Sequence, residues 1–185
     1  GVEIKGGVNY FLWSKNHSKK CKFISYQNNK KISESIRDLN QFEFLIRYNE
    51  AIPILEKIKS FNTESFMKIV LPAKPFGFRT FFKGDPKNNN KSIKIFVNKG
   101  IGYVNREEIK INAKIVDEHK VIVPYAFGSG NPKSDRLKPI YSPPGTCCSE
   151  TYLVIGPFES KKVCENVINF LNSKFFHFFY QCCSS

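Results

Sequence analysis

Histidine, tryptophan and arginine are scarce in this chain of 185 residues, and long apolar runs are missing. It contains three His, one Trp and five Arg. No apolar run approaches the roughly 18 residues that would span a bilayer, and the most apolar stretch, residues 175–183, is too short. The N-terminus lacks the basic-then-apolar layout of a signal peptide. We therefore expect a soluble, cytoplasmic protein.

Patterns for metal binding and for disulfides are also missing. The six Cys comprise two adjacent pairs, at 147–148 and 182–183, and the isolated Cys21 and Cys164. There is no Cys-x-x-Cys, and no His stands at ligand spacing from a cysteine, so a zinc site is not expected. The sequence favours reduced thiols, in the core or on the surface of a cytosolic protein.

Catalytic patterns are equally scarce. His17, His119 and His177 lie far apart in the sequence, with no nucleophile or carboxylate pattern around any of them, which favours surface or packing roles. The acidic pairs at 107–108 and 117–118 are sequence neighbours, whose side chains point apart on a strand. A nuclease-like metal site is therefore not expected. The sequence predicts no catalytic, cofactor-binding or metal-binding residue within this chain.

Positive charge is what the chain has in excess. It carries 29 Lys and Arg against 16 Asp and Glu, a formal net charge of +13. A net positive charge of this size attracts polyanions such as nucleic acids, because each phosphate that the protein neutralises releases condensed counterions. An AT-rich genome also encodes chains rich in Lys, Asn, Ile and Phe, so genome bias is a second explanation. The charge favours nucleic-acid binding and leaves that alternative open.

Four segments of the chain carry a resemblance to a known family. They resemble, in order, the region that follows the catalytic domain in Eco57I-like adenine-specific DNA methyltransferases of bacterial restriction-modification systems. The resemblance extends over residues 1–175. Its segments are residues 6–13 (GGVNYFLW), 75–80 (PFGFRT), 119–126 (HKVIVPYA), and 144–146 with 150–158 (PGT and ETYLVIGPF).

The resemblance implies a parent enzyme that transfers a methyl group from S-adenosylmethionine to adenine N6. This chain, residues 1–185, would be the C-terminal DNA target-recognition region of that enzyme, and S-adenosylmethionine would bind to the parent rather than to this fragment. Because the chain opens on Gly1, we expect it to be cut from a longer protein whose catalytic methyltransferase domain is its partner. Ser14 departs from the Asp usual in relatives, and the tail 177–185 resembles nothing in the family.

Two near misses to methyltransferase signatures are interpreted as turns. Residues 127–130 (FGSG) imitate the cofactor-binding turn, and residues 142–145 (SPPG) imitate the base-gripping Pro-Pro-aromatic motif. About a dozen residues separate them, whereas one βαβ unit needs roughly 30. No aromatic residue follows Pro144 to stack on an extruded base, since the next residue is Gly145.

The predicted fold is a single α+β domain, a strand-rich mixed sheet with one middle helix and one C-terminal helix. At 185 residues and 41% hydrophobic, the chain can bury one substantial core. Helical spacing is found over residues 47–61, with Pro53 tolerable only in the first turn, and after a cap at 159–160 as far as Phe178. The predicted strands are 8–13, 21–26, 67–71, 78–83, 93–97, 101–104, 121–125 and 152–155.

Basic loops with aromatic neighbours supply the candidate DNA contacts. If the loops share one edge of a sheet, their cations can track phosphates. Arg79 and Arg136 could read guanine through the guanidinium fork, and the amides of 88–90 could read adenine. The candidates are Lys15, Lys19 and Lys20; Arg79, Lys83, Lys87, Asn88, Asn89 and Lys91; and Lys133, Arg136 and Lys138.

The expected function is sequence-specific recognition of double-stranded DNA for an adenine-specific methyltransferase or restriction-modification enzyme. The alternative is a docking domain that packs against the methyltransferase or a restriction subunit. A nuclease would need a carboxylate cluster that the sequence does not show. The expectation rests on basic loops from distant segments gathering on one surface.

Overall fold

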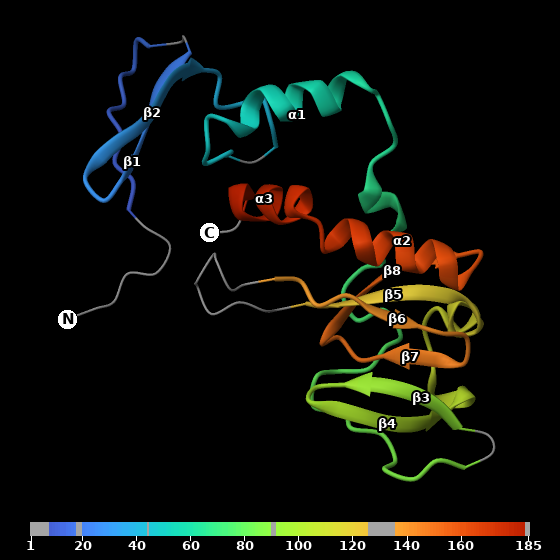
Figure 1. The fold of residues 1–185 in the computed structure, drawn as a ribbon. Coiled ribbons are helices and arrows are strands. Elements are labelled where there is room, and N and C mark those ends of the chain that lie inside the picture. Colours follow the sequence, from blue (N-terminus) through green and yellow to red (C-terminus); the bar gives the residue numbers. More distant parts are fainter. Residues whose placement is uncertain (1–7, 18–19, 44, 90–91, 126–135, 184–185) are drawn as a thin grey trace. The chain divides into compact units, whose positions relative to one another are not determined.

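The computed structural model of the protein describes residues 8–17, 20–43, 45–89, 92–125 and 136–183. The chain groups into two compact units (Figure 1). Unit 1 comprises Gly1–Thr63 with His177–Ser185, and unit 2 comprises Glu64–Phe176. Helices and strands are both present in each unit, which confirms the α+β class. Folding of residues 1–185 as one domain stays a prediction.

Unit 1 is built on an antiparallel hairpin of β1 (Cys21–Gln27) and β2 (Lys30–Arg37). Asn28 and Asn29 connect the two strands with φ of 50° and 61°. Two successive residues at positive φ are what a two-residue turn needs to match the strand twist, and Asn tolerates that conformation. A two-residue turn therefore joins β1 to β2.

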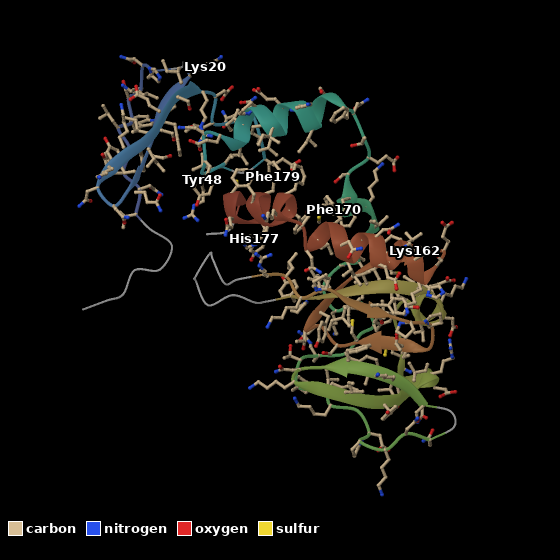
Figure 2. The ribbon with its side chains drawn as sticks, viewed as in Figure 1. Lys20, Tyr48, Lys162, Phe170, His177 and Phe179 are labelled. Atoms are coloured by element: carbon tan, nitrogen blue, oxygen red, sulfur yellow. The ribbon has the colours of Figure 1, made fainter. Side chains whose placement is uncertain are left out.

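A short helix and the C-terminal segment complete unit 1. Helix α1 (Ala51–Ser60) begins after Glu50, so Pro53 does lie in its first turn. Ala51, Ile46 and Cys182 form the buried centre, with Phe178 and Phe179 packed against it. The labelled side chains of Tyr48 and Phe179 belong to this cluster (Figure 2).

Asn49 fixes the hairpin to the segment before α1. Its Oδ1 accepts a hydrogen bond from Ser35 Oγ at 2.6 Å, and its Nδ2 donates to Ser33 Oγ at 2.9 Å. Arg37 lies in the same strand, buried, with its guanidinium 3.8 Å from the centroid of the Phe23 ring. The inner face of β2 is thus polar, and it is held by hydrogen bonds and a cation–π contact.

Unit 2 contains two three-stranded sheets (Figure 1). In the first, with the order β4-β3-β7, β3 (Ser92–Val97) pairs antiparallel with β4 (Gly100–Asn105) and parallel with β7 (Thr146–Cys148). In the second, with the order β6-β5-β8, β5 (His119–Pro124) pairs antiparallel with both β6 (Ile140–Ser142) and β8 (Tyr152–Phe158).

Helices and short 3-10 turns surround these sheets. Helix α2 (Lys161–Leu171) packs on the sheet β6-β5-β8, where Cys164 and Leu171 join Val121, Val123 and Ile155 in one core cluster. Helix α3 (Lys174–Cys183) follows after two residues. The 3-10 turns are η1 (Phe66–Ile69), η2 (Arg106–Glu108) and η3 (Ala113–Asp117).

The larger core of unit 2 lies on the inner face of β3 and β4. The alternating residues Ile93, Ile95 and Val97 are all buried, together with Val104 on the paired strand. Phe76 is fully buried in the same cluster. The predicted strands 93–97 and 101–104 are therefore confirmed as the paired strands β3 and β4.

Other predicted elements are confirmed with shifted bounds. Strand β5 includes the predicted 121–124, and β8 begins at the predicted Tyr152. Ser160 caps α2, accepting a hydrogen bond from the Val163 N–H at 3.3 Å. The single C-terminal helix that was predicted is two helices, because the chain turns at Asn172 and Ser173.

Three predicted strands are wrong. Residues 8–13 form no regular structure and are exposed, because no neighbouring strand pairs with them in the described chain. Of the predicted strand 67–71, residues 67–69 belong to η1, where the Ser65 side chain accepts from Met67 N, and Val70 forms an isolated bridge with Ile155. Residues 78–83 contain a turn, closed by a hydrogen bond from Phe82 N to Arg79 O at 3.0 Å.

The remaining sequence expectations concern membranes and thiols. Within the described ranges, no helix combines the length and the apolar character needed to cross a bilayer. Cys147, Cys148, Cys164 and Cys182 are buried, and Cys21 is half-buried. The placement of these thiols in the core, one of the two predicted environments, is thus found for four cysteines.

Candidate nucleic-acid interface

The turn at residues 79–82 is held by an acid 70 positions away in the sequence. Glu150 accepts hydrogen bonds from the Thr80 N–H at 3.0 Å and from Thr80 Oγ1 at 3.1 Å. Its carboxylate also lies 3.6 Å from Arg79 Nη1. The Thr80 main-chain hydrogen bond, assisted by the Arg79 charge, lowers the pKa of Glu150 below its usual value. Phe82 packs on Phe78 with ring centroids 4.5 Å apart.

Residues 83–85 then run against the free edge of β4. Asp85 exchanges two main-chain hydrogen bonds with Tyr103, at 2.8 and 2.9 Å. A Cβ on Gly102 would lie 2.0 Å from the Lys83 carbonyl oxygen, and a Cβ on Gly84 would lie 2.8 Å from that of Tyr103. The two glycines therefore permit this close approach of the main chains.

Side chains extend the arrangement to the turn of the hairpin. Lys83 Nζ donates to the Asn98 carbonyl at 3.2 Å, which places it beside the turn that carries Lys99. Asp85 Oδ1 accepts from the Lys87 N–H at 2.8 Å. We call residues 79–89 together with Asn98, Lys99 and Tyr103 the β4 edge.

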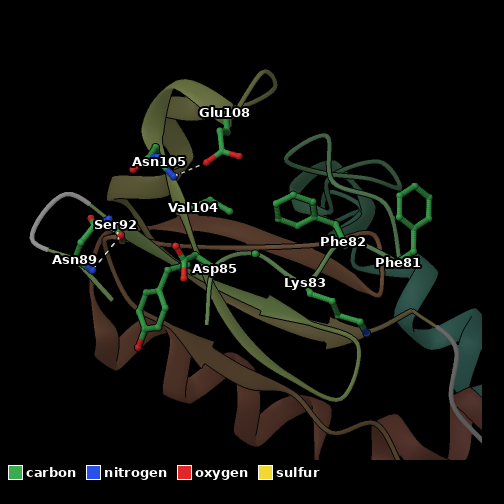
Figure 3. Close-up of a pocket in the computed structure, with 11 residues that line it drawn as sticks. Phe81, Phe82, Lys83, Asp85, Asn89, Ser92, Val104, Asn105 and Glu108 are labelled. Carbon is green, nitrogen blue, oxygen red and sulfur yellow. Dashed lines mark hydrogen bonds between the residues drawn. The ribbon is translucent and has the colours of Figure 1, made fainter. Parts of the chain in front are cut away.

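The β4 edge borders an open hollow of about 490 Å³ (Figure 3). Its lining combines two phenylalanines, a lysine, two acids and several polar side chains. The residues lining it are Phe81, Phe82, Lys83, Gly84, Asp85, Asn89, Ser92, Tyr103, Val104, Asn105 and Glu108.

Five of the predicted DNA-binding residues lie in one exposed segment at the β4 edge: Arg79, Lys83, Lys87, Asn88 and Asn89. Arg79 is oriented by Glu150, rather than by the phenylalanines around it in the sequence. Asn89 Oδ1 accepts from Ser92 Oγ at 2.5 Å, so this amide is positioned by its neighbour.

The other predicted contacts lie elsewhere in the fold. Lys15 and Lys20 are exposed residues of unit 1, where Lys20 immediately precedes β1 (Figure 2). Arg136 and Lys138 are exposed and precede β6, in the other sheet of unit 2. Lys19, Lys91 and Lys133 lie outside the described residues. The gathering of all three groups on one surface stays a prediction.

Sequence reasoning missed three residues of this region. Lys99 occupies the hairpin turn, with φ of 64°, and could have been found from its place between the predicted strands 93–97 and 101–104. Tyr103 pairs with Asp85, and Glu150 holds the turn at 79–82. No local pattern in the sequence indicates either of these two contacts.

The acidic pairs and the near-miss motifs have structural roles where they are described. Asp117 binds the Arg106 guanidinium with two contacts, at 2.5 and 2.9 Å, and this pairing lowers the pKa of Asp117. Glu108 Oε1 accepts from the Asn105 N–H at 2.8 Å. Residues 143–145 form the turn between β6 and β7, with Gly145 at φ of 78°, whereas residues 127–130 lie outside the description.

The histidines do not assemble with other metal-binding side chains. Among the described residues, no group of three or more His, Cys, Asp or Glu is arranged to hold a metal ion. His119 Nδ1 lies 2.7 Å from Tyr141 Oη, and the two rings stack with centroids 5.9 Å apart. This is a packing role, as predicted for His119.

Lys120 is a fully buried cation at the centre of unit 2. Its Nζ donates to the carbonyls of Val116 at 3.1 Å, Glu118 at 2.9 Å and Pro143 at 3.4 Å. Desolvation lowers the pKa of Lys120 from 10.5 to about 8, while nearby groups such as Cys147 act in the opposite direction. Lys120 therefore connects η3, β5 and the β6–β7 turn at an electrostatic cost.

This cost predicts a pH-dependent contribution to stability. Below pH 8 both the native and the unfolded protein carry the Lys120 proton, so the contribution is constant. Between pH 8 and 10.5 the unfolded chain binds more protons, so the free energy of unfolding rises with pH. Urea unfolding of the wild type and Lys120→Met at several pH values should show a difference that grows in favour of the wild type by up to about 3 kcal/mol. A difference independent of pH would contradict this assignment, since the titrations of groups that do not interact with Lys120 cancel in the comparison.

In comparisons with known proteins, no family model, no curated protein and no solved structure matches the chain.

Proposed function

We propose that unit 2 binds double-stranded DNA through the β4 edge. The observation that carries the proposal is a set of three exposed cations, Lys83, Lys87 and Lys99, on one edge of the sheet. Within the described residues none of the three forms an ion pair with an acid. Cations without acidic partners can neutralise phosphates at little electrostatic cost.

Arg79 is the candidate for recognising a base, in addition to the phosphate contacts of the three lysines. Its guanidinium is 60% exposed and is oriented by Glu150, so the fork is available to solvent and restricted in direction. A planar fork of this kind matches O6 and N7 of guanine in the major groove.

The wider role follows from the sequence resemblance and is part of the same proposal. The chain would be the target-recognition region of an adenine-specific DNA methyltransferase of a restriction-modification system. The catalytic domain of the parent would supply S-adenosylmethionine binding and methyl transfer. This chain would supply duplex grip and sequence choice, and we propose no catalytic step for it.

Salt dependence of duplex binding tests the electrostatic grip. If at least four phosphates are neutralised, affinity should fall by about 100-fold between about 50 and 200 mM salt. Fluorescence anisotropy with a labelled duplex of random sequence measures this with the full chain. Equal affinity at the two salt concentrations would contradict a grip on phosphates.

Unit 1 favours a second candidate function, docking to a protein. Tyr10, Phe11 and Leu12 are 87%, 84% and 98% exposed in an irregular segment. On the outer face of the hairpin, Ile36 is 70% exposed and Tyr26 is 55% exposed. Exposed apolar side chains that gather in a patch are typical of protein interfaces, and residues 10–12 supply three in succession. The partner would be the methyltransferase domain or a restriction subunit.

The two candidates can be separated by the same titration. DNA recognition by unit 2 requires salt-dependent duplex binding by the isolated chain. A chain that only docks would leave the duplex unbound at about 50 mM salt, and its charge would reflect genome composition. Binding and docking can also coexist, since their surfaces belong to different units.

A further inference from the structure

The hollow beside the β4 edge has the dimensions of a ligand site. Its volume of about 490 Å³ lies within the range of about 300–1,000 Å³ found for small-molecule pockets. Figure 3 shows Phe81 and Phe82 on one side of it and Asn89, Ser92 and Asn105 on the other. An aromatic wall facing polar side chains is suited to a flat, polar ligand.

Phe81 lies on a turn that is closed by hydrogen bonds. Its side chain is 81% exposed, and it has no ring partner among the described residues. The residues around it are fixed: Thr80 is bound twice by Glu150, and Phe82 stacks on Phe78. Exposing a phenylalanine on an ordered turn gains nothing for folding, whereas it offers a stacking surface at low entropic cost.

Polar groups around the hollow define the ligand further. Glu108 uses Oε1 to accept from Asn105 N, and Figure 3 shows its second oxygen directed away from that contact. A carboxylate oxygen accepts hydrogen bonds from amino and imino groups and repels carbonyl oxygens. At the other end, Lys83 lines the hollow, and its Nζ donates to the Asn98 carbonyl at the hairpin turn.

We propose that the hollow binds one unpaired nucleobase, stacked on Phe81, with its phosphate near Lys83 and its amino edge toward Glu108. The remaining Glu108 oxygen favours guanine, whose adjacent N1–H and N2–H₂ can both donate to it, over thymine, whose single N3–H lies between two carbonyl oxygens. This inference rests on the proposed DNA binding and deepens it. The β4 edge would bind the DNA backbone, and the hollow would bind a base that is no longer stacked in the duplex.

The test uses the full chain and a set of labelled duplexes of about 20 base pairs. One is fully paired, and the others carry a single unpaired guanosine, thymidine or abasic spacer at the same position. The guanosine bulge should bind about tenfold tighter than the abasic bulge, which controls for bending. Phe81→Ala should remove this gain, while Phe61→Ala, which alters another exposed phenylalanine, should retain it.

A second variant tests the role of the carboxylate. Glu108→Gln keeps an oxygen to accept from Asn105 N and removes the charge. The preference for the guanosine over the thymidine bulge should be about tenfold in the wild type and should largely disappear in this variant. Melting temperatures of Phe81→Ala and Glu108→Gln that equal the wild-type value confirm that both variants are folded.

The outcomes separate this inference from the proposed function. Equal affinity for the guanosine and abasic bulges, with salt-dependent binding of the paired duplex, overturns the base site and leaves DNA binding intact. If no duplex binds, DNA binding fails, and guanosine monophosphate then tests the hollow by calorimetry. Binding of this nucleotide that Phe81→Ala abolishes would support a site for free nucleotides, whereas no binding would overturn the site.

Discussion

Replacing Lys83, Lys87 and Lys99 together by Gln is expected to weaken duplex binding by about 100- to 1,000-fold at about 50 mM salt. The three side chains are exposed and form no ion pair in the described structure, so their removal should leave folding intact. For each phosphate contact that is lost, about one counterion stays bound to the DNA. At this salt concentration, each such loss weakens the affinity by about tenfold.

A matched variant separates a local contact from a general effect of net charge. Lys114, Lys162 and Lys174 are also exposed, but they lie on η3, α2 and α3. Changing these three to Gln removes the same total charge and should alter affinity by less than about fivefold, because distant charges are screened. Equal losses in the two variants would show that charge alone, and not the β4 edge, determines binding.

The second large effect is expected from Gly102→Ala. The added Cβ would lie 2.0 Å from the Lys83 carbonyl oxygen, a main-chain atom that cannot rotate away. Residues 83–85 must therefore move off β4 and give up the two hydrogen bonds between Asp85 and Tyr103. We expect unit 2 to lose about 3 kcal/mol of stability, and its melting temperature to fall by on the order of 10 °C.

Gly100 provides the control for this substitution. It lies in the same strand, a Cβ at this position would meet no atom within 4 Å beyond the adjacent residues, and its φ is not in the left-handed region. Gly100→Ala should change the free energy of unfolding by less than about 1 kcal/mol. Calorimetric melting of both variants checks the pair. Similar melting temperatures would contradict the close approach of residues 83–85 to β4, and with it the geometry of the hollow.

The elements that sequence predicted well are those determined by local composition. Residues 93–97 and 101–104 are rich in β-branched and aromatic side chains on either side of a compact turn, and they form the hairpin of β3 and β4. Strand β2 was not predicted, because its pattern is inverted: Ile32 and Ile36 face solvent, while Ser33, Ser35 and Arg37 face inward. There, hydrogen bonds to Asn49 replace apolar burial.

Residues 8–13 show the opposite failure. Their apolar run predicts a buried strand, but burial depends on a partner surface, and the described chain provides none. The same limit applies to the candidate site. The sequence indicates Lys83 and Lys87 as candidate DNA contacts because they are close together in one basic segment. The hydrogen bonds from Lys83 to Asn98 and from Thr80 to Glu150 join residues that are far apart in the sequence. Such contacts follow from the fold and not from spacing.

The dependence of duplex affinity on salt, compared between the wild type and the Lys83, Lys87 and Lys99 variant, tests most directly whether the β4 edge binds phosphates. The slope of log K against log salt should be shallower by about 3 in the variant, because three contacts are lost. Parallel lines for the two proteins would contradict the proposal and place any DNA contact elsewhere on the chain.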